Sequence, residues 1–256
     1  MSYLMITREE RVLRLTLNNP ERRNALDEAT CHEMVGALRD AGKDRTVGCV
    51  LLDASGQVFC SGLELDELLS PNGPELSEIH EQLFTFGMHY HKPIVAAVQG
   101  AAFGAGVGLI ANCHVVLAAQ GAQFGLTEIR SGFWPFVIHR SVALAIGERR
   151  TVELSLTGRL FGTSDAQQYG LVHEVMPPVE LDDRATATAR QLAYASQETL
   201  RRGLDFVQKS REMSSETAGR LSGEYTERTL RSADFREGAH AYRERRKPEW
   251  PSLQVR

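Results

Sequence analysis

One glutamate of this sequence stands in a setting that favours proton transfer. Glu128 lies in the mostly apolar stretch Phe124-Gly125-Leu126-Thr127-Glu128-Ile129. Partial burial there would raise the pKa of its carboxyl group toward the range that suits a general acid or base. A single glutamate is more often a solvated or ion-paired residue. A catalytic role for Glu128 is therefore favoured only if other functional groups accompany it.

Glycines crowd into the segment 100–108, which reads Gly-Ala-Ala-Phe-Gly-Ala-Gly-Val-Gly. The segment lacks the Gly-Lys-Ser/Thr ending of a phosphate loop and the third-glycine spacing of a dinucleotide fingerprint. It does supply bare backbone at the start of a helix, where N–H groups are unpaired and developing negative charge is stabilised. Close packing of small residues between a helix and a sheet is the competing interpretation.

A second bare turn, Gly56-Gln-Val-Phe-Cys-Ser-Gly-Leu-Glu64, also stands where a strand gives way to a helix. Two such turns at the carboxyl ends of strands in one sheet can aim two backbone N–H groups at one carbonyl oxygen. Together with Glu128, the two turns indicate an oxyanion hole with an acid or base beside it.

Composition narrows the classes of protein to consider. The 256 residues contain 29 Lys and Arg against 33 Asp and Glu, a net charge of −4, which argues against nucleic acid or an anionic membrane as partner. No apolar run approaches the roughly 20 residues of a membrane-spanning helix, and the first residues lack a secretory pattern, so we expect a cytoplasmic protein.

The cysteines are scattered along the sequence, which predicts buried, reduced thiols and no metal site. They are Cys31, Cys49, Cys60 and Cys113.

Strand and helix patterns alternate along most of the chain, which is typical of an α/β core with parallel strands and right-handed crossovers. We expect strands over 4–7, 12–17, 48–52, 93–98, 114–118 and 171–175, and helices over 26–41, 64–69, 76–89 and 104–112; the stretch 181–242 is expected to be helical, and a breaker cluster spans 70–74. The division expected from this pattern is a core over residues 1–195 and a C-terminal helical region over 196–256.

Several segments resemble the crotonase, or enoyl-CoA hydratase/isomerase, superfamily. The matching stretches are 19–26 (Asn-Pro-Glu-Arg-Arg-Asn-Ala-Leu), 59–64, 93–100, 124–129, 156–159, 170–172, 235–238 and 245–248. The resemblance implies a β-β-α spiral core with a C-terminal α-helical trimerisation region. It also implies an acyl-CoA thioester as substrate, no cofactor besides the coenzyme A of that substrate, and a homotrimer or a dimer of trimers.

The resemblance also implies roles for individual residues. It puts the two oxyanion-hole amides on Leu63 and Ala105, beside Glu128. It places substrate contacts on Arg22, Arg23, Ala25, Cys60, Gly62, Gly104, Trp134, Tyr242, Arg246 and Lys247. The basic run 243–247, which includes Arg246 and Lys247, would bind the coenzyme A phosphates; the alternative for this run is a solvated tail. Tyr242 would close the acyl channel, or it would pack against a neighbouring helix.

The sequence departs from its family at Gly108, where similar hydratases carry a second glutamate. One base suffices to move a proton from one carbon of an enoyl thioester to another, which predicts isomerisation of 3-enoyl-CoA to 2-enoyl-CoA by Glu128. One alternative is an enoyl-CoA hydratase in which Glu128 acts with Glu64, His139 or an ordered water. Another is an acyl-CoA-binding protein with impaired catalysis.

A second departure is the bulky segment Phe133-Trp-Pro-Phe-Val-Ile-His-Arg140. Its rings would narrow the acyl pocket, although a core position is the favoured interpretation for Trp134 and Phe136. His139 is a second titrating group or a satisfied surface histidine. Glu64, at the start of a predicted helix, is expected to cap that helix or shape the pocket.

Overall fold

The computed structural model describes residues 3–69 and 78–253. The predicted breaker cluster at 70–74 and the first residues of the predicted helix at 76–89 lie outside these ranges. Within them, no helix is both long and apolar enough to cross a membrane.

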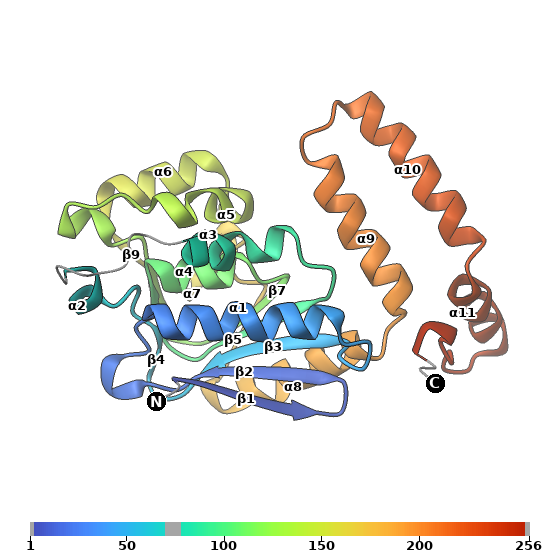
Figure 1. The fold of residues 1–256 in the computed structure, drawn as a ribbon, viewed down its shortest axis with the longest axis horizontal. Helices are drawn as coiled ribbons and strands as arrows, with labels where there is room; N and C mark the ends of the chain where they lie inside the picture. Colours follow the sequence, from blue (N-terminus) through green and yellow to red (C-terminus); the bar gives the residue numbers. More distant parts are fainter. Residues whose placement is uncertain (1–2, 70–77, 254–256) are drawn as a thin grey trace.

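A six-stranded sheet forms the centre of the molecule, with strand order β1-β2-β3-β5-β7-β10. The N-terminal hairpin pairs antiparallel, and every other neighbouring pair is parallel. This arrangement confirms the predicted α/β class (Figure 1). The strands are β1 (Leu4–Glu9), β2 (Val12–Leu17), β3 (Cys49–Ala54), β5 (Ile94–Val98), β7 (Val115–Ala119) and β10 (Glu174–Met176).

A smaller sheet carries the turns that the sequence singled out. Its order is β4-β6-β8-β9, with β4 parallel to β6, β6 parallel to β8, and β9 antiparallel to β8. The strands are β4 (Val58–Cys60), β6 (Ala101–Phe103), β8 (Gln123–Gly125) and β9 (Leu160–Gly162). Because β4 and β6 are parallel neighbours, the chain leaves both strands at the same edge of this sheet.

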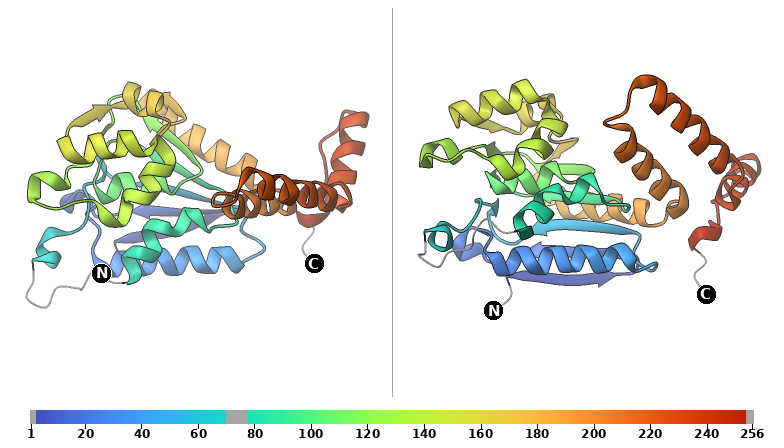
Figure 2. Two further views of the ribbon diagram at one scale, coloured as in Figure 1. Left: turned by 90° about the horizontal axis from the view of Figure 1, so that it is seen from above. Right: turned by 45° about the horizontal axis from the view of Figure 1, so that its top comes forward.

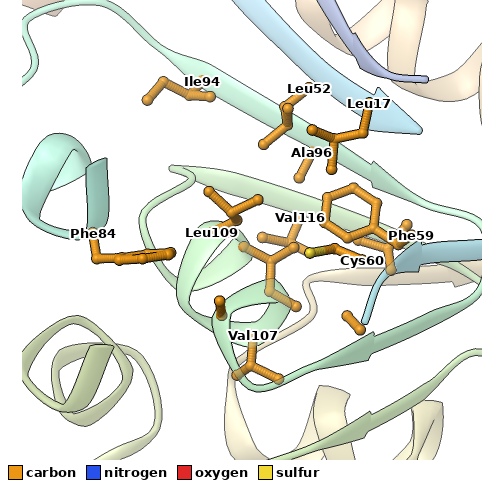
Figure 3. Close-up of a cluster of buried hydrophobic side chains, with 14 of the residues drawn as sticks. Leu17, Leu52, Phe59, Cys60, Phe84, Ile94, Ala96, Val107, Leu109 and Val116 are labelled. Atoms are coloured by element: carbon orange, nitrogen blue, oxygen red, sulfur yellow. The ribbon is translucent and has the colours of Figure 1, made fainter. Parts of the chain in front are cut away.

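Helices cover both faces of the large sheet. Alternate residues of β3 and β5 point to opposite faces, so Val50 and Leu52 join the larger core with α1, α3 and α4, whereas Cys49 and Leu51 pack with α8. Figure 3 shows part of the larger core between the sheet and α4. The helices of this core region are α1 (Glu28–Lys43), α2 (Leu65–Leu68), α3 (Glu78–Thr85), α4 (Ala105–Ala111), α5 (Phe136–Ile146), α6 (Glu148–Thr157), α7 (Thr163–Tyr169) and α8 (Leu181–Ala193).

The C-terminal helices form an arm that extends away from this core (Figures 1 and 2). They are α9 (Gln197–Ser210), α10 (Ser215–Leu230) and α11 (Ala233–Glu244). The expected boundary after residue 195 lies in the link between α8 and α9. Asp234 holds the base of the arm together, because its buried carboxylate accepts hydrogen bonds from the Ser196 hydroxyl at 2.5 Å and from the Ser252 amide at 2.9 Å.

Local differences from the predicted elements have local causes. The first helix begins at Glu28 rather than at residue 26, because the Asp27 side chain accepts a hydrogen bond from the Thr30 amide and caps the helix. The strand predicted at 171–175 is β10, which starts only at Glu174; Leu171 is buried and ends the preceding turn. All four cysteines are free thiols, as predicted.

Candidate active site

The first bare turn joins β6 to α4 through Gly104. Gly104 has φ +51° and ψ −116°, a backbone conformation that side-chain-bearing residues rarely adopt. Its own amide donates to the Gly125 carbonyl at 2.9 Å, which ties the turn to β8. Ala105 follows as the first residue of α4, so its N–H has no acceptor within the helix.

The second bare turn places Leu63 beside Leu26. The Leu26 amide donates to the Gly62 carbonyl, and the Glu64 amide donates to the Leu26 carbonyl, each at 2.9 Å. In this parallel bridge the amide of Leu63 faces away from Leu26. Gly62 has φ +121°, and a methyl group there would lie 3.7 Å from the Phe103 carbonyl oxygen, so the two turns are neighbours.

The carboxylate of Glu128 lies against the first turn. An added Cβ at Gly104 would be 2.8 Å from Oε1 of Glu128 and 3.5 Å from Oε2. The side chain begins a short 3-10 helix over Glu128–Ser131, and burial raises the pKa of its carboxyl group. Its Oε2 is buried, and it accepts no hydrogen bond from any residue that the structure describes. The carboxylate of Glu128 is therefore desolvated, and its Oε2 lies unpartnered, among the described residues, against the turn that precedes Ala105.

Gly108 lies on the same face of α4, four residues beyond Gly104. A Cβ there would be 2.3 Å from Cγ2 of Ile138 and 3.1 Å from Cδ1 of Phe84. The space where a side chain at residue 108 would stand is already filled by apolar groups. The sequence did not predict that Ile138 and Phe84 lie against Gly108, although a glycine in the middle of a helix indicates a close contact.

The segment after Glu128 is more exposed than predicted. Phe136 is 70% exposed, so the core position expected for it is wrong; it is the first residue of α5, and its ring meets that of Phe133 edge-on, at 6.1 Å between centroids. Trp134 is half-buried, with its ring centroid 6.2 Å from that of His139. The Nδ1 atom of His139 is buried and has no hydrogen-bond partner among the described residues.

Glu64 caps α2, as predicted: its side chain accepts from the Asp66 amide at 3.4 Å. Its other oxygen pairs with the Arg22 guanidinium at 3.2 Å. Arg23 is exposed and has a left-handed backbone, and the half-buried Ala25 donates its amide to the Arg22 carbonyl. These predicted ligand contacts thus lie next to the Leu63 turn.

Cys60 has a fully buried side chain, and burial raises the pKa of its thiol to about 12. A methyl group at Gly106 would lie 2.5 Å from the Cys60 carbonyl oxygen. Cys60 therefore supports the Leu63 turn from inside the core, and its thiol has no access to a ligand. Its contact with substrate stays a prediction.

The C-terminal residues of the predicted set lie in the arm. Tyr242, on α11, is 87% exposed, and Figures 1 and 2 show α11 at the opposite end of the molecule from α2. Arg246 pairs with Glu237 at 2.5 Å and with Glu244 at 2.7 Å. Lys247 follows it and is exposed. A single chain does not bring these residues to Glu128, and their contacts with substrate stay predictions.

Comparison with known proteins adds an independent line of evidence. Residues 7–253 match the family model described as "Enoyl-CoA hydratase/isomerase". The chain is 32% identical to 2,3-dehydroadipyl-CoA hydratase of Escherichia coli K12 over 98% of this chain and 99% of the relative. It is 29% identical to 1,2-epoxyphenylacetyl-CoA isomerase of the same organism, over 98% of each chain. The solved structure of an enoyl-CoA hydratase from Mycobacterium smegmatis superposes with a TM-score of 0.91, at 29% identity, over 98% of this chain and 99% of that one.

Proposed function

The chain belongs to the enoyl-CoA hydratase/isomerase family, whose members act on acyl-CoA thioesters, and we propose that it converts 3-enoyl-CoA to 2-enoyl-CoA. The observation that carries this proposal is the setting of Glu128. Its carboxylate has a free oxygen beside the Ala105 turn, whereas the neighbouring position on α4 is a glycine covered by hydrocarbon. Glu128 is the proposed base, and α4, which lies next to it, carries no carboxylate.

The backbone amides of Leu63 and Ala105 hold the thioester oxygen in the proposed reaction. Glu128 takes a proton from C2, and the C–H electron pair moves toward the carbonyl to give a dienolate whose oxygen charge the two amides stabilise. Such donors each contribute about 3 to 4 kcal/mol to lowering a barrier. The protonated Glu128 then returns its proton to C4, and the double bond ends between C2 and C3. No atom is gained or lost overall.

Hydration of 2-enoyl-CoA is the second candidate function. The observation in its favour is the buried Nδ1 of His139, a second polar atom after Glu128 that lacks a hydrogen-bond partner among the described residues. Several relatives are named enoyl-CoA hydratases. Glu64 is the weaker partner for Glu128, because its carboxylate already binds Arg22 and the Asp66 amide.

The two functions separate in one assay on the purified protein. Isomerisation of a 3-enoyl-CoA creates the conjugated enoyl thioester and raises its absorbance, whereas hydration of crotonyl-CoA removes it. We expect the first reaction to be the faster, and Glu128→Gln to slow it by about 10² to 10⁴-fold. Glu180→Gln, an exposed control, should leave the rate unchanged.

Each contrary outcome has a defined meaning. Hydration without isomerisation would replace the proposal by the second candidate. If the parent protein turns over neither substrate, acyl-CoA binding without catalysis is the better description. Turnover that survives Glu128→Gln would remove Glu128 from the mechanism.

The assembly is part of the proposal. Because Tyr242, Arg246 and Lys247 lie far from Glu128 of their own chain, we propose that they act at the site of a neighbouring copy in a homotrimer or a dimer of trimers. The exposure of Tyr242 supports this arrangement. Light scattering on the full chain measures the mass of the assembly, and a monomer that turns over acyl-CoA at the full rate would exclude it.

A further inference from the structure

Ile138 stands at the contact between α5 and α4, the helix whose N-terminal turn meets the carboxylate of the proposed base Glu128. It covers Gly108, with its Cγ2 and Cβ at 2.3 and 2.8 Å from the position of an added Cβ. The same face of α4, one turn earlier, presents Gly104 to the carboxylate of Glu128. Glu128 therefore lies against the residue that precedes α4, and Ile138 covers α4 one turn further along the chain.

Phe84 completes this apolar cover from a third element. Its ring would lie 3.1 Å from a Cβ at Gly108, and Figure 3 shows the side chain reaching from α3 toward α4. Ile138 and Phe84 are 1% and 0% exposed. Both side chains are packed into the core and cannot move aside without disturbing it. We call this pair, Ile138 and Phe84, the apolar wall.

The apolar wall affects what the neighbouring carboxylate can do. A buried water needs two to four polar partners, and hydrocarbon supplies none. A water that attacks a double bond needs a second polar group to hold it, in addition to the base. Removal and return of a substrate proton need only the base and the oxyanion donors. The wall therefore opposes water addition and leaves proton transfer unaffected.

We propose that Ile138, backed by Phe84, is the specificity-determining residue that restricts this site to proton transfer within the bound thioester and keeps solvent from the base. This inference rests on the proposed function, because it assumes that Glu128 is the base. It assigns to Ile138 a role in the choice of reaction and in shielding the transferred proton. Ile138 does not touch the reacting atoms in this role.

Ile138→Ala tests the proposal, with Val142→Ala as the matched control. Val142 is a fully buried aliphatic residue of the same helix, one turn further on, so its truncation loses comparable packing. Isomerisation of a 3-enoyl-CoA in deuterated water reports how much of the transferred hydrogen comes from solvent. We expect Ile138→Ala to raise this deuterium fraction at least twofold above that of the parent. It should also raise the ratio of crotonyl-CoA hydration to isomerisation by about tenfold, while Val142→Ala changes neither.

A second pair of variants keeps the test decisive if Ile138→Ala folds poorly. Gly108→Glu in combination with Ile138→Gly removes Cγ2 of Ile138, the atom that lies nearest to a side chain at residue 108, and leaves the Phe84 ring in place. Gly108→Glu with Val142→Gly carries the same carboxylate and the same glycine penalty in the helix, but keeps the wall. Crotonyl-CoA hydration should rise only in the first combination.

The outcomes separate this inference from the proposed function. Equal deuterium fractions and equal ratios in Ile138→Ala and Val142→Ala, or equal hydration in the two double variants, would overturn the role of Ile138. The reaction of the parent protein decides the proposed function by itself. A parent that already hydrates crotonyl-CoA faster than it isomerises would refute that function, whatever the variants do.

Discussion

The backbone of Gly104 and the carboxylate of Glu128 are in direct contact, so closely that a single methyl group at Gly104 would stand 2.8 Å from Oε1. The turn before Ala105 is thus also the surface on which the carboxylate of Glu128 rests. The positions of the proposed oxyanion donor and the proposed base are coupled through Gly104.

Gly104→Ala should therefore impair catalysis more than stability. The new methyl group would displace the Glu128 carboxylate, and a misplacement of about 1 Å can cost about 10²-fold in rate. Gly121→Ala is the control, because Gly121 also has a positive φ, of +89°, but nothing within 4 Å of an added Cβ. We expect similar losses of thermal stability in both variants and a loss of kcat in Gly104→Ala alone. Equal activities would show that the contact has no catalytic consequence.

The raised pKa of Glu128 predicts an acid limb in the pH profile. The base must be ionised, so kcat/KM should fall as the pH drops through the pKa of Glu128. Because burial raises that pKa above the ordinary glutamate value, the midpoint should lie at a higher pH than the value of about 4.3 for an exposed glutamate. Steady-state rates between pH 4 and 8 measure this midpoint. A rate that stays constant down to pH 4.5 would contradict the burial of the base.

His114 should make the fold sensitive to mild acid. It is half-buried, its Nδ1 accepts a hydrogen bond from the Ile94 amide at 3.0 Å, and desolvation lowers the pKa of its imidazole from 6.5 to about 4. Between these two values the unfolded chain binds a proton that the folded chain does not. The contribution of His114 is therefore fully present above pH 6.5 and is lost as the pH falls toward 4. Urea unfolding of the parent and of His114→Asn should converge as the pH drops from 7 to 4.5; a constant difference would count against this account.

Asp234 should control the stability of the C-terminal arm. Its buried carboxylate accepts from Ser196 and Ser252, so Asp234→Ala leaves buried donors unpaired at a cost of about 3 kcal/mol. Hydrogen exchange should accelerate in α9 and α11 and remain slow in β3 and β5. Asp183→Ala, on an exposed position of α8, should change neither region. Uniform acceleration across the whole chain would show that Asp234 does not act locally.

Local patterns were sufficient for the hairpin and the buried strands of the large sheet, but they did not predict the small sheet or helices α5, α6 and α7. Apolar periodicity over short stretches of the sequence predicted the N-terminal hairpin, the buried strands β3, β5 and β7, and helix α4. The glycines before Leu63 and Ala105 indicated the two bare turns for the same reason, because a left-handed backbone conformation is a local property.

Contacts between distant segments were not predictable in this way. Nothing in the sequence indicated that Ile138 meets Gly108 or that Arg246 pairs with Glu237. The exposure of Phe136 was also mispredicted, because an aromatic residue is buried or exposed according to what packs on its side of the helix.

By itself the sequence indicated most strands of the large sheet and several of the helices, the resemblance to the family, Glu128 as the candidate base, and the absence of a carboxyl group at residue 108. The tertiary structure alone decided that Glu128 rests on Gly104 with an unpaired oxygen and that Ile138 and Phe84 fill the space over Gly108. The physical reason is the separation along the chain of the residues that interact. Periodicity and turn conformation are set by neighbours along the chain, whereas the desolvation of a carboxylate and the filling of a space depend on how α3, α4 and α5 pack against each other.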